Sequence, residues 1–576
     1  MSELSFLLQR KWKFLSPNKK LIEDLAKKAS IPPLVAKILL NRGICEKDEV
    51  LSHLTPLLSC LSDPFLMADM ERAVARLIQA IKKRERIVIF GDYDVDGVTS
   101  SAILIRFLTQ LGVNVTSYIP HRIEEGYGLN PEAIKKLASH KVNLIVTVDC
   151  GISSIEEVRL ANSLGIDVII TDHHQVPKQL PPAIAVLNPK RSDCKFPFKE
   201  LAGVGVVFNL IRALRRRLHE IGFWEDGNFP NLKEYLDIVA LGTIADIVPL
   251  LGDNRILVRT GLKVLEQSKK VGIKALCEVA GIKPPFNTDT IGFILAPRIN
   301  AAGRMDHAQK ALKLLVTEDE TEAKRLAKEL NELNQKRQAE EARILKEAQE
   351  IAKEMGERNS YVIASKGWHR GVIGIVASRL MDVFYRPIIM ISLDDDIAHG
   401  SARCPQGLNL YNLLLECESY LKAFGGHSCA AGLCVSTKML DAFSKEFERV
   451  SKKAWSELED KEPFICLDAK VNINELSNSE FRKMFSLLEP FGPGYEEPFL
   501  CVSGSFVSKK RIVGQKHLKL YLAEENSKEL ELLGWGLADK FDIDWNNTEL
   551  ACRACLNTWN GVTKLELRLL DLRFLS

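Results

Sequence analysis

The sequence has 576 residues, too many for one hydrophobic core, so we expect about three or four domains. Hydrophobic residues make up 46% and charged residues 27% of the chain, which is typical of a globular protein. The net charge of only +3 excludes a globally basic surface, so a nucleic-acid site would have to be a local groove. No apolar run is long enough to cross a bilayer, and the polar N-terminus lacks the apolar core of a signal peptide; both features predict a cytoplasmic protein without a membrane segment.

The first predicted elements are helices, over a leader of residues 1–80. From residue 86 short β-branched runs alternate with amphipathic helices, which predicts βαβ crossovers and a parallel sheet with helices on both faces. This α/β domain is predicted to cover residues 81–316. Its expected strands are 86–90, 113–118, 143–148, 167–171 and 183–187, and its expected helices are 98–111, 131–139, 154–164, 203–221 and 232–243.

Residues 317–358 are rich in Glu, Lys, Ala and Leu at helical spacing, which predicts one long helix joining two lobes. A smaller α/β domain is expected over residues 359–456. The segment PFGPGYEEP, residues 490–498, is typical of an inter-domain junction. Short β-like runs near the C-terminus predict a small barrel resembling an OB-fold, in a last domain over residues 457–576.

Metal-ligand residue types follow three of the predicted strands. The first strand runs into GDYDVDG, with Asp92, Asp94 and Asp96; the third ends in Asp149; and the fourth ends in the segment DHH, residues 172–174. The later helical segment ALGTIAD adds Asp246. Ligands bind beyond the carboxyl ends of the strands in an open parallel sheet, so these side chains are expected to meet at one edge.

Hydrolysis of a phosphodiester is the reaction that such a set of side chains suits. Two divalent ions about 3.5–4 Å apart shield the phosphate and activate water, and they need hard oxygen ligands. Each motif has a simpler interpretation by itself: a calcium loop or helix cap for DxDxDG, a strand-end cap for Asp149, and buried structural histidines for His173 and His174. The occurrence of ligand-type residues at three strand ends favours the metal site.

The successive motifs GDYDVDG, VDCG, TDHH and GTIAD resemble those of the DHH phosphoesterase superfamily, and their order most resembles its RecJ branch. Further segments agree: PHRIEEGYGLN, PRINAAGRM, HRGVIGIVASRL, GSAR and GGHSCAAG, the last typical of the associated DHHA1 domain. The resemblance covers roughly residues 45–500. It implies a DHH domain, a long connecting helix, a DHHA1 domain and an OB-fold-like domain, in the order of the predicted elements.

The resemblance implies a pair of divalent cations, Mg²⁺ or Mn²⁺, held by five side chains. Asp92 and Asp94 would be ligands, Asp149 would bridge the two ions, and His173 would complete the shell of one ion together with Asp246. Both ions accept carboxylate oxygens, and the imidazole favours Mn²⁺.

Three neighbouring residues would act beside the metals. The resemblance implies that Asp172 orients its neighbours, that His174 faces the phosphate and assists protonation or charge stabilisation, and that Asp96 orients the loop. Some members have a histidine two residues before the first motif aspartate, where this sequence has Phe90, so one ion would be held by more water. The pair Tyr495-Glu496 replaces a frequent Asn-Pro without evident catalytic meaning.

Arginine and glycine-rich turns are the candidate phosphate-binding features, because guanidinium groups and backbone amides both donate hydrogen bonds to phosphate. The arginines are expected in turns or at strand ends, except Arg379, which is expected as a surface residue within a helix. Lysines of the C-terminal domain fit either a nucleic-acid groove or an ordinary basic surface. The predicted substrate-binding residues are Arg122, Arg298, Asn300, Arg304, Arg370, Ser401, Arg403, Gly425, Gly426 and His427.

A RecJ-like chain would degrade single-stranded DNA from 5′ to 3′ into mononucleotides, in repair and recombination. It would act as a monomer, with a single-strand-binding protein and a helicase as partners. Two alternatives remain: a DHH phosphodiesterase acting on short oligonucleotides, cyclic dinucleotides or pyrophosphate, and a non-catalytic single-strand-binding scaffold. The long C-terminal region favours a polymer substrate, and the complete ligand set disfavours the scaffold.

Overall fold

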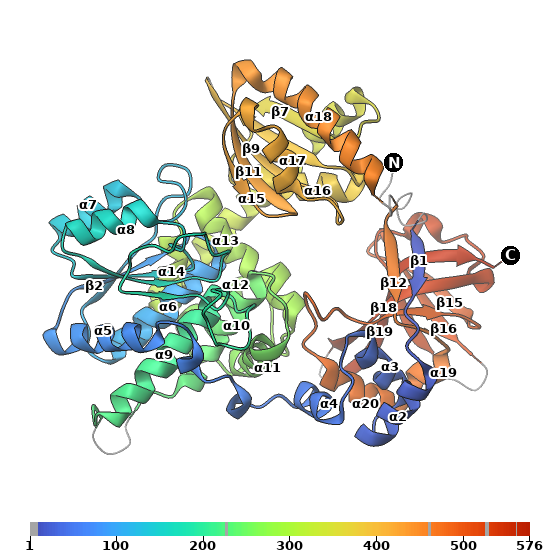
Figure 1. Ribbon diagram of the computed structural model, residues 1–576. Helices are drawn as coiled ribbons and strands as arrows, with labels where there is room; N and C mark the ends of the chain where they lie inside the picture. Colours follow the sequence, from blue (N-terminus) through green and yellow to red (C-terminus); the bar gives the residue numbers. More distant parts are fainter. Residues whose placement is uncertain are drawn as a thin grey trace. The chain divides into compact units, whose positions relative to one another are not determined.

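The computed structural model describes residues 10–224, 229–394, 396–458, 462–524, 529–559 and 562–575. The chain forms two compact units. Unit 1 consists of Met1–Thr55, Gln338–Glu489 and Glu497–Ser576, and unit 2 of Pro56–Arg337 and Pro490–Glu496. Figure 1 labels helices and strands of both units. Within the described part of the chain, no helix combines the length and apolar character that a membrane span requires.

Unit 2 is built on a five-stranded parallel sheet in the order β3-β2-β4-β5-β6, as predicted. Strands β2 and β4 are buried at every position, which explains their uninterrupted apolar runs, because both faces of a parallel sheet are covered. The strands are β2 (Ile87–Gly91), β3 (Val115–Tyr118), β4 (Leu144–Val148), β5 (Asp167–Thr171) and β6 (Ala185–Leu187).

Two separate cores cover the faces of this sheet. On one side, Val88 and Ile145 pack in a cluster with residues of α7 and α8; on the other, Ile89 and Val146 pack in the large core with α5, α6, α9 and α10. The alternation follows the period of two along a strand. The helices concerned are α5 (Met70–Lys83), α6 (Val95–Gln110), α7 (Pro131–Ser139), α8 (Ile155–Ser163), α9 (Gly203–Glu220) and α10 (Leu236–Ala245).

The register of the sheet brings its ligand-bearing strand ends to one level. Gly91 of β2 pairs with Val148 of β4, and Val148 pairs with Thr171 of β5, so the next residue of each strand leaves the sheet at the same edge. The chain connects β2 to β3 on one side and reaches β4 on the other. The strand order therefore reverses at the carboxyl ends of β2 and β4, which is the usual ligand position in such sheets.

Further helices complete unit 2, and one long helix leads out of it. Helix α15 (Glu320–Met355) is a single element of 36 residues, which confirms the predicted connecting helix. The segment of residues 490–496 belongs to unit 2, where the Pro493 carbonyl accepts from the Leu250 amide. The remaining elements are η1 (Leu58–Cys60), η2 (Pro64–Leu66), η3 (Leu232–Tyr235), α11 (Gly252–Glu266), α12 (Val271–Ala280), the π-helix η4 (Thr290–Leu295), α13 (Ala296–Met305) and α14 (Gln309–Val316).

Unit 1 contains the predicted smaller α/β domain, a five-stranded sheet in the order β10-β11-β9-β8-β7. Only β7 and β8 pair in parallel among these strands, and a core with α17 and α18 fills one face. The elements are β7 (Tyr361–Lys366), α16 (Ile373–Phe384), β8 (Ile388–Leu393), β9 (Ile397–Arg403), α17 (Leu410–Glu416), η5 (Glu418–Tyr420), β10 (Leu421–Gly426), β11 (Ala430–Ser436), η6 (Thr437–Met439) and α18 (Leu440–Glu457).

The C-terminal part of unit 1 is a seven-stranded, mostly antiparallel sheet in the order β13-β14-β18-β19-β17-β16-β15. Its elements are β12 (Phe464–Leu467), β13 (Ala469–Val471), α19 (Ile473–Ser477), α20 (Ser479–Leu488), β14 (Phe499–Val502), β15 (Phe506–Val513), β16 (His517–Ala523), β17 (Leu530–Gly534), η7 (Ala538–Lys540), η8 (Trp545–Asn547), β18 (Thr548–Trp559) and β19 (Val562–Phe574).

The N-terminal segment differs from the prediction that residues 1–80 are helical. Helices α2 (Lys19–Ala29), α3 (Pro33–Asn41) and α4 (Lys47–Leu54) are present, but β1 (Lys11–Phe14) precedes them as a strand. β1 pairs in parallel with β12, and the Trp12 indole donates to Asp571 at 2.9 Å. The partner strand of β1 is far away in the sequence, so local helical propensity carries no information about this pairing.

Candidate active site

The acidic loop after β2 leads directly into helix α6. The Asp94 side chain caps that helix, since its Oδ1 accepts from the amides of Asp96 at 2.9 Å and Gly97 at 3.1 Å. Gly97 is required by close approach, because a Cβ there would lie 2.5 Å from the carbonyl oxygen of Asp92. The helix cap and the ligand loop are therefore the same structure, and the sharp entry into α6 directs the carboxylates towards the sheet edge.

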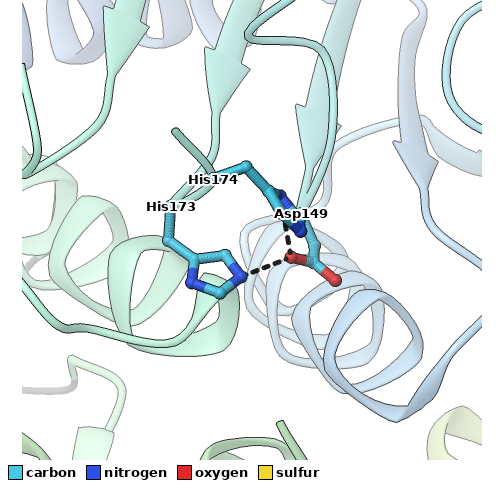
Figure 2. Close-up of side chains that lie close together, drawn as sticks. All are labelled: Asp149, His173 and His174. Atoms are coloured by element: carbon cyan, nitrogen blue, oxygen red, sulfur yellow. Dashed lines mark ion pairs between the residues drawn. The ribbon is translucent and has the colours of Figure 1, made fainter. Parts of the chain in front are cut away.

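The carboxylate and imidazole groups of the strand ends meet as the sequence predicts. The Nε2 atom of His173 lies 3.2 Å from Asp149 Oδ1, 3.5 Å from Asp246 Oδ2 and 3.8 Å from Asp96 Oδ2. Figure 2 shows the imidazoles of His173 and His174 directed at the Asp149 carboxylate. Three groups are close enough to hold a metal ion: Asp92, Asp94 and Asp149; Asp96, His173 and Asp246; and Asp149, His173 and His174.

Several polar atoms of this cluster are buried without a hydrogen bond in the described part of the chain. They include Asp92 Oδ1, Asp149 Oδ1, Asp246 Oδ2 and the Nε2 of His173. Each such atom destabilises the metal-free fold, by about 1–3 kcal/mol for a neutral group and more for a charged one. These orphaned atoms face one another, and hard oxygens with one imidazole suit Mg²⁺ or Mn²⁺. The residues present therefore fit a cation site.

The shifted pKa values of the cluster agree with a site built for a positively charged ligand. Burial, together with the charge of neighbouring carboxylates, raises the pKa of Asp92, Asp149 and Asp246 well above the usual range. Burial likewise raises the pKa of Asp96 to about 7. Burial and the adjacent His174 lower the pKa of His173 to about 3, which keeps that imidazole neutral, as a metal ligand must be. Bound cations would allow the carboxylates to ionise together.

Asp172 holds the two histidines in place through hydrogen bonds. Its Oδ1 accepts from the backbone amides of His173 at 2.7 Å and His174 at 3.0 Å, and its Oδ2 accepts from the Ile152 amide at 2.9 Å. The same Oδ1 lies 2.7 Å from His174 Nδ1. Burial alone would raise the pKa of Asp172, but the hydrogen bond and charge of His174 lower it. With Nδ1 engaged, His174 has Nε2 available for a substrate.

Asp96 links the loop to the start of helix α9. Its carboxylate accepts from the amides of Gly203 at 2.6 Å and Val204 at 2.8 Å. The sequence did not reveal Gly203 as a site residue. A Cβ on it would lie 2.8 Å from Asp149 Oδ1 and 2.9 Å from Asp96 Oδ2. Gly203 thus leaves room for two carboxylates at the site, and a glycine opening a helix is too common a pattern to have signalled this.

Other residues near the site also escaped the sequence analysis. The Tyr127 hydroxyl donates to the Asp149 carbonyl at 3.2 Å, and the Asn188 side-chain amide donates to the His174 carbonyl at 2.9 Å. The segment PHRIEEGYGLN contains both Arg122 and Tyr127, but its sequence pattern predicted only Arg122 as a site residue. Phe90, the departure from the family pattern, is fully buried and stacks on Tyr118 at 5.1 Å between ring centroids, so it belongs to the core.

The predicted substrate-binding residues of unit 2 lie in two places. Arg122 is in the loop after β3, with its guanidinium 4.7 Å from the centre of the Tyr93 ring. Arg298, Asn300 and Arg304 lie in helix α13 and not in a turn, which corrects the prediction for this segment. The Asn300 side chain accepts from the Val95 amide at 3.2 Å and so fixes the first turn of α6.

Gly303 explains why PRINAAGRM was misread as a turn. A Cβ on Gly303 would lie 2.4 Å from the carbonyl oxygen of Tyr93, so this glycine permits helix α13 to pass close to the ligand loop. Pro297 lies in the first turn of α13, where proline is compatible with a helix. Arg298 donates to the Ile294 carbonyl at 2.6 Å and the Asn331 side chain at 3.0 Å.

The other predicted substrate-binding residues are in the smaller α/β domain of unit 1. Arg403 ends β9 and donates to the hydroxyls of Ser378 at 3.1 Å and Ser401 at 3.3 Å. Arg370 lies in a turn and pairs with Asp394, and Arg379 pairs with Glu341 from within α16. Gly425 and Gly426 end β10, and the His427 amide donates to the Ala430 carbonyl at 2.8 Å. The β10–β11 turn thus carries the predicted GGH segment.

Models of three protein families match successive parts of the chain. The DHH family N-terminal domain matches residues 86–243, the DHHA1 domain matches residues 358–453, and the RecJ OB domain matches residues 467–571. Together they cover the ligand-bearing sheet, the second sheet and the C-terminal sheet.

Individual proteins are similar over nearly the whole chain. The single-stranded-DNA-specific exonuclease RecJ of Bacillus subtilis (strain 168) is 36% identical over 569 residues, covering 97% of this chain and 70% of that protein. The protein of the same name from Haemophilus influenzae is 35% identical, covering 95% and 98%. The crystal structure of RecJ in complex with Mn²⁺ from Thermus thermophilus is 31% identical with a TM-score of 0.83, covering 98% of this chain and 79% of that one. Its Mg²⁺ complex gives a TM-score of 0.76 at 29% identity, covering 98% and 78%.

Proposed function

Because the chain belongs to the RecJ family of single-stranded-DNA-specific exonucleases, we propose that it removes mononucleotides from single-stranded DNA in the 5′ to 3′ direction, in DNA repair and recombination. The chain is a metal-dependent exonuclease of single-stranded DNA, and its cofactors are Mg²⁺ or Mn²⁺. The observation that carries the proposal is the buried cluster of Asp92, Asp149, His173 and Asp246, whose polar atoms lack hydrogen bonds.

We assign the ligands of two cations from this cluster. Asp92, Asp94 and Asp149 would hold one, and Asp149, His173 and Asp246 would hold the other, with Asp149 shared. The proximity of the three carboxylates supports the first set. The distances of 3.2 Å and 3.5 Å from His173 Nε2 to Asp149 and Asp246 support the second. When bound, the cations neutralise phosphate charge and lower the pKa of the attacking water. Phe90 contributes no ligand atom, so the first cation would keep more water, which suits Mg²⁺.

The remaining side chains of the site would position its reacting groups and protonate the leaving oxygen. Asp172 fixes the orientation of His174, which would present Nε2 to the scissile phosphate and stabilise its charge or protonate the leaving oxygen. Asp96 would act through Gly203 and Val204, holding the start of α9 against the ligands. Neither residue needs to contact a cation in this assignment.

Each unit by itself carries proposed DNA-binding residues. In unit 2, Arg122, Arg298 and Arg304 would lie along the phosphates near the cations. Asn300 would contribute by fixing the first turn of α6. In unit 1, a terminal phosphate would be held by guanidinium groups and by backbone amides of the GGH turn. The residues proposed there are Arg370, Ser401, Arg403, Gly425, Gly426 and His427.

Digestion of end-labelled single-stranded DNA with Mg²⁺ or Mn²⁺ tests the reaction and its direction together. A 5′ label should be released as a mononucleotide at once, while a 3′ label should remain on progressively shorter strands. The opposite order would exclude 5′ to 3′ digestion, and preference for a dinucleotide series would indicate a phosphodiesterase of short oligonucleotides. Asp149→Ala should abolish cleavage and retain some DNA binding; unchanged cleavage would exclude the shared-ligand assignment.

The family also suggests how substrate reaches the enzyme. We propose that a helicase supplies the single strand in the cytoplasm, that a single-strand-binding protein presents it, and that the chain acts as a monomer. Sedimentation of the purified chain tests the last point. Adding each partner to the digestion assay tests the first two, since a true partner should raise the rate on duplex or coated DNA.

A further inference from the structure

Tyr127 lies in a hydrogen-bonded loop beside the carboxylates and imidazoles of the candidate active site. The loop follows β3, and Glu125 secures it: its carboxylate accepts from the Tyr118 hydroxyl at 2.6 Å and from the His121 amide at 2.8 Å. Gly126 and Gly128 both have positive φ, at 83° and 77°, a conformation that glycine adopts without strain. The two glycines let the chain reverse on either side of Tyr127, so a short, anchored turn presents this side chain.

The hydroxyl end of Tyr127 is fixed at the metal centre. It donates to the Asp149 carbonyl at 3.2 Å and lies 3.4 Å from His174 Nδ1. Asp149 itself has φ of +62°, a conformation that L-residues rarely adopt, so this hydrogen bond helps to hold a strained residue. The position of the tyrosine ring is therefore set by the same backbone that carries the shared carboxylate.

The ring end of Tyr127 remains open. The residue is 53% exposed, although its hydroxyl is bonded at the site. The neighbouring rings of Tyr93 and His174 lie at interplanar angles of 78° and 79° to it, and among the aromatic pairs of the described residues none is stacked flat on Tyr127. The guanidinium of Arg122 over Tyr93 adds positive charge to this group.

An exposed, rigidly held aromatic face beside a phosphodiester site has the properties of a base-stacking platform. We infer that Tyr127 stacks on the base of the nucleotide bound at the metal centre, and so sets the position of the scissile phosphate relative to Asp149. This inference rests on the proposed exonuclease function. It predicts that the enzyme uses the base itself, without reading its identity, because every base offers a similar face.

A substrate-by-variant comparison isolates the stacking contact. The wild type, Tyr127→Leu and Tyr127→Phe are compared on single-stranded DNA with a normal or an abasic residue at the end where digestion starts. Tyr127→Leu should lower kcat/KM about 10-fold or more on normal DNA and cause little further loss on abasic DNA. Tyr127→Phe keeps the ring, so its ratio between the two substrates should equal that of the wild type, whatever its overall rate.

The controls separate stacking from damage to the site. Thermal unfolding with and without Mn²⁺ reports whether the cation site of each variant is intact, because an intact site is stabilised by the bound ion. Phe223→Leu alters another exposed aromatic residue, beyond the C-terminal end of α9 and so about 27 Å from the Gly203 end, and should behave as the wild type on both substrates. An equal loss for Tyr127→Leu on normal and abasic DNA, or no loss on either, overturns the inference. Failure of the wild type to digest any single strand would instead defeat the proposed function.

Discussion

Replacing Gly203 with alanine would test how tightly the cation site is packed. The added Cβ would lie 2.8 Å from Asp149 Oδ1 and 2.9 Å from Asp149 Cβ, whereas ordinary contacts begin near 3.4 Å, so about 0.5 Å must be gained by movement. The Cβ of Asp149 is fixed by the backbone and cannot swing away as a side-chain end can. We therefore expect the shared carboxylate to shift.

The expected effect on activity exceeds the effect on stability. Overpacking destabilises by about 1–3 kcal/mol, and the better helix propensity of alanine offsets up to about 1 kcal/mol of that. A misplacement of about 1 Å at a reacting centre can lower a rate about 100-fold, so a shift of about half that size predicts a loss of about 10-fold or more.

Gly205→Ala is the matched control for Gly203→Ala. Gly205 lies in the same first turn of α9, but its added Cβ would meet the end of the flexible Leu201 side chain at 3.2 Å. Nucleotide release from single-stranded DNA is measured over a Mn²⁺ titration, with thermal unfolding of both variants. If Gly203→Ala cleaves at the wild-type rate with an unchanged Mn²⁺ requirement, the close packing of Gly203 on Asp149 has no catalytic consequence and the reasoning is refuted.

Four other substitutions probe charge and packing. Asp172→Asn should lower the rate about 10- to 100-fold at saturating Mn²⁺, because the neutral amide holds the His174 imidazole less firmly; kinetics at wild-type level would contradict this. Burial raises the folded-state pKa of Asp96 from 3.8 to about 7, so its contribution to stability is present below pH 3.8 and lost as pH rises to about 7. The metal-free wild type should accordingly lose Tm relative to Asp96→Asn across that window, and a constant difference would argue against it. Asp468→Ala should destabilise unit 1 by about 3 kcal/mol in denaturant unfolding, because it leaves the buried Arg42 without its 2.7 Å partner, while Lys470→Ala at the exposed pair with Glu549 should have an effect below about 1 kcal/mol.

The sequence was sufficient for those parts of the fold that repeat a local pattern. Unbroken apolar runs such as 144–148 belong to buried parallel strands, and strands that end at one edge bring their following residues together. The sequence alone therefore predicts that Asp92, Asp149 and His173 meet at one site. The long helix α15 was equally predictable from the sequence, because its 36 residues have helical spacing and contain no proline or glycine.

Features that depend on close approach between distant segments were not predictable. Gly203 is separated from Asp96 by 107 residues, and only the folded chain shows that its missing side chain makes room for two carboxylates. Arg298 and Arg304 were expected in a turn or at a strand end, but their segment is helix α13, in which Gly303 permits the close approach to Tyr93. The pairing of β1 with β12 joins Lys11 to Phe464, far away in the sequence. In each case the deciding partner lies outside any local window.

Backbone strain and unpaired charge occur together at the ligand-bearing sheet edge. Asp149 has φ of +62°, and Ile247, directly after Asp246, has φ of +60° although it is β-branched and 71% exposed. Each such residue costs about 1–3 kcal/mol, and the buried carboxylates beside them add to this cost. The doubly covered sheet tolerates these losses because its strands are held from both faces. A cation recovers part of the free energy when it binds, so folding and metal binding are coupled in this unit, and a change that relaxed the site would weaken the driving force for holding the metal.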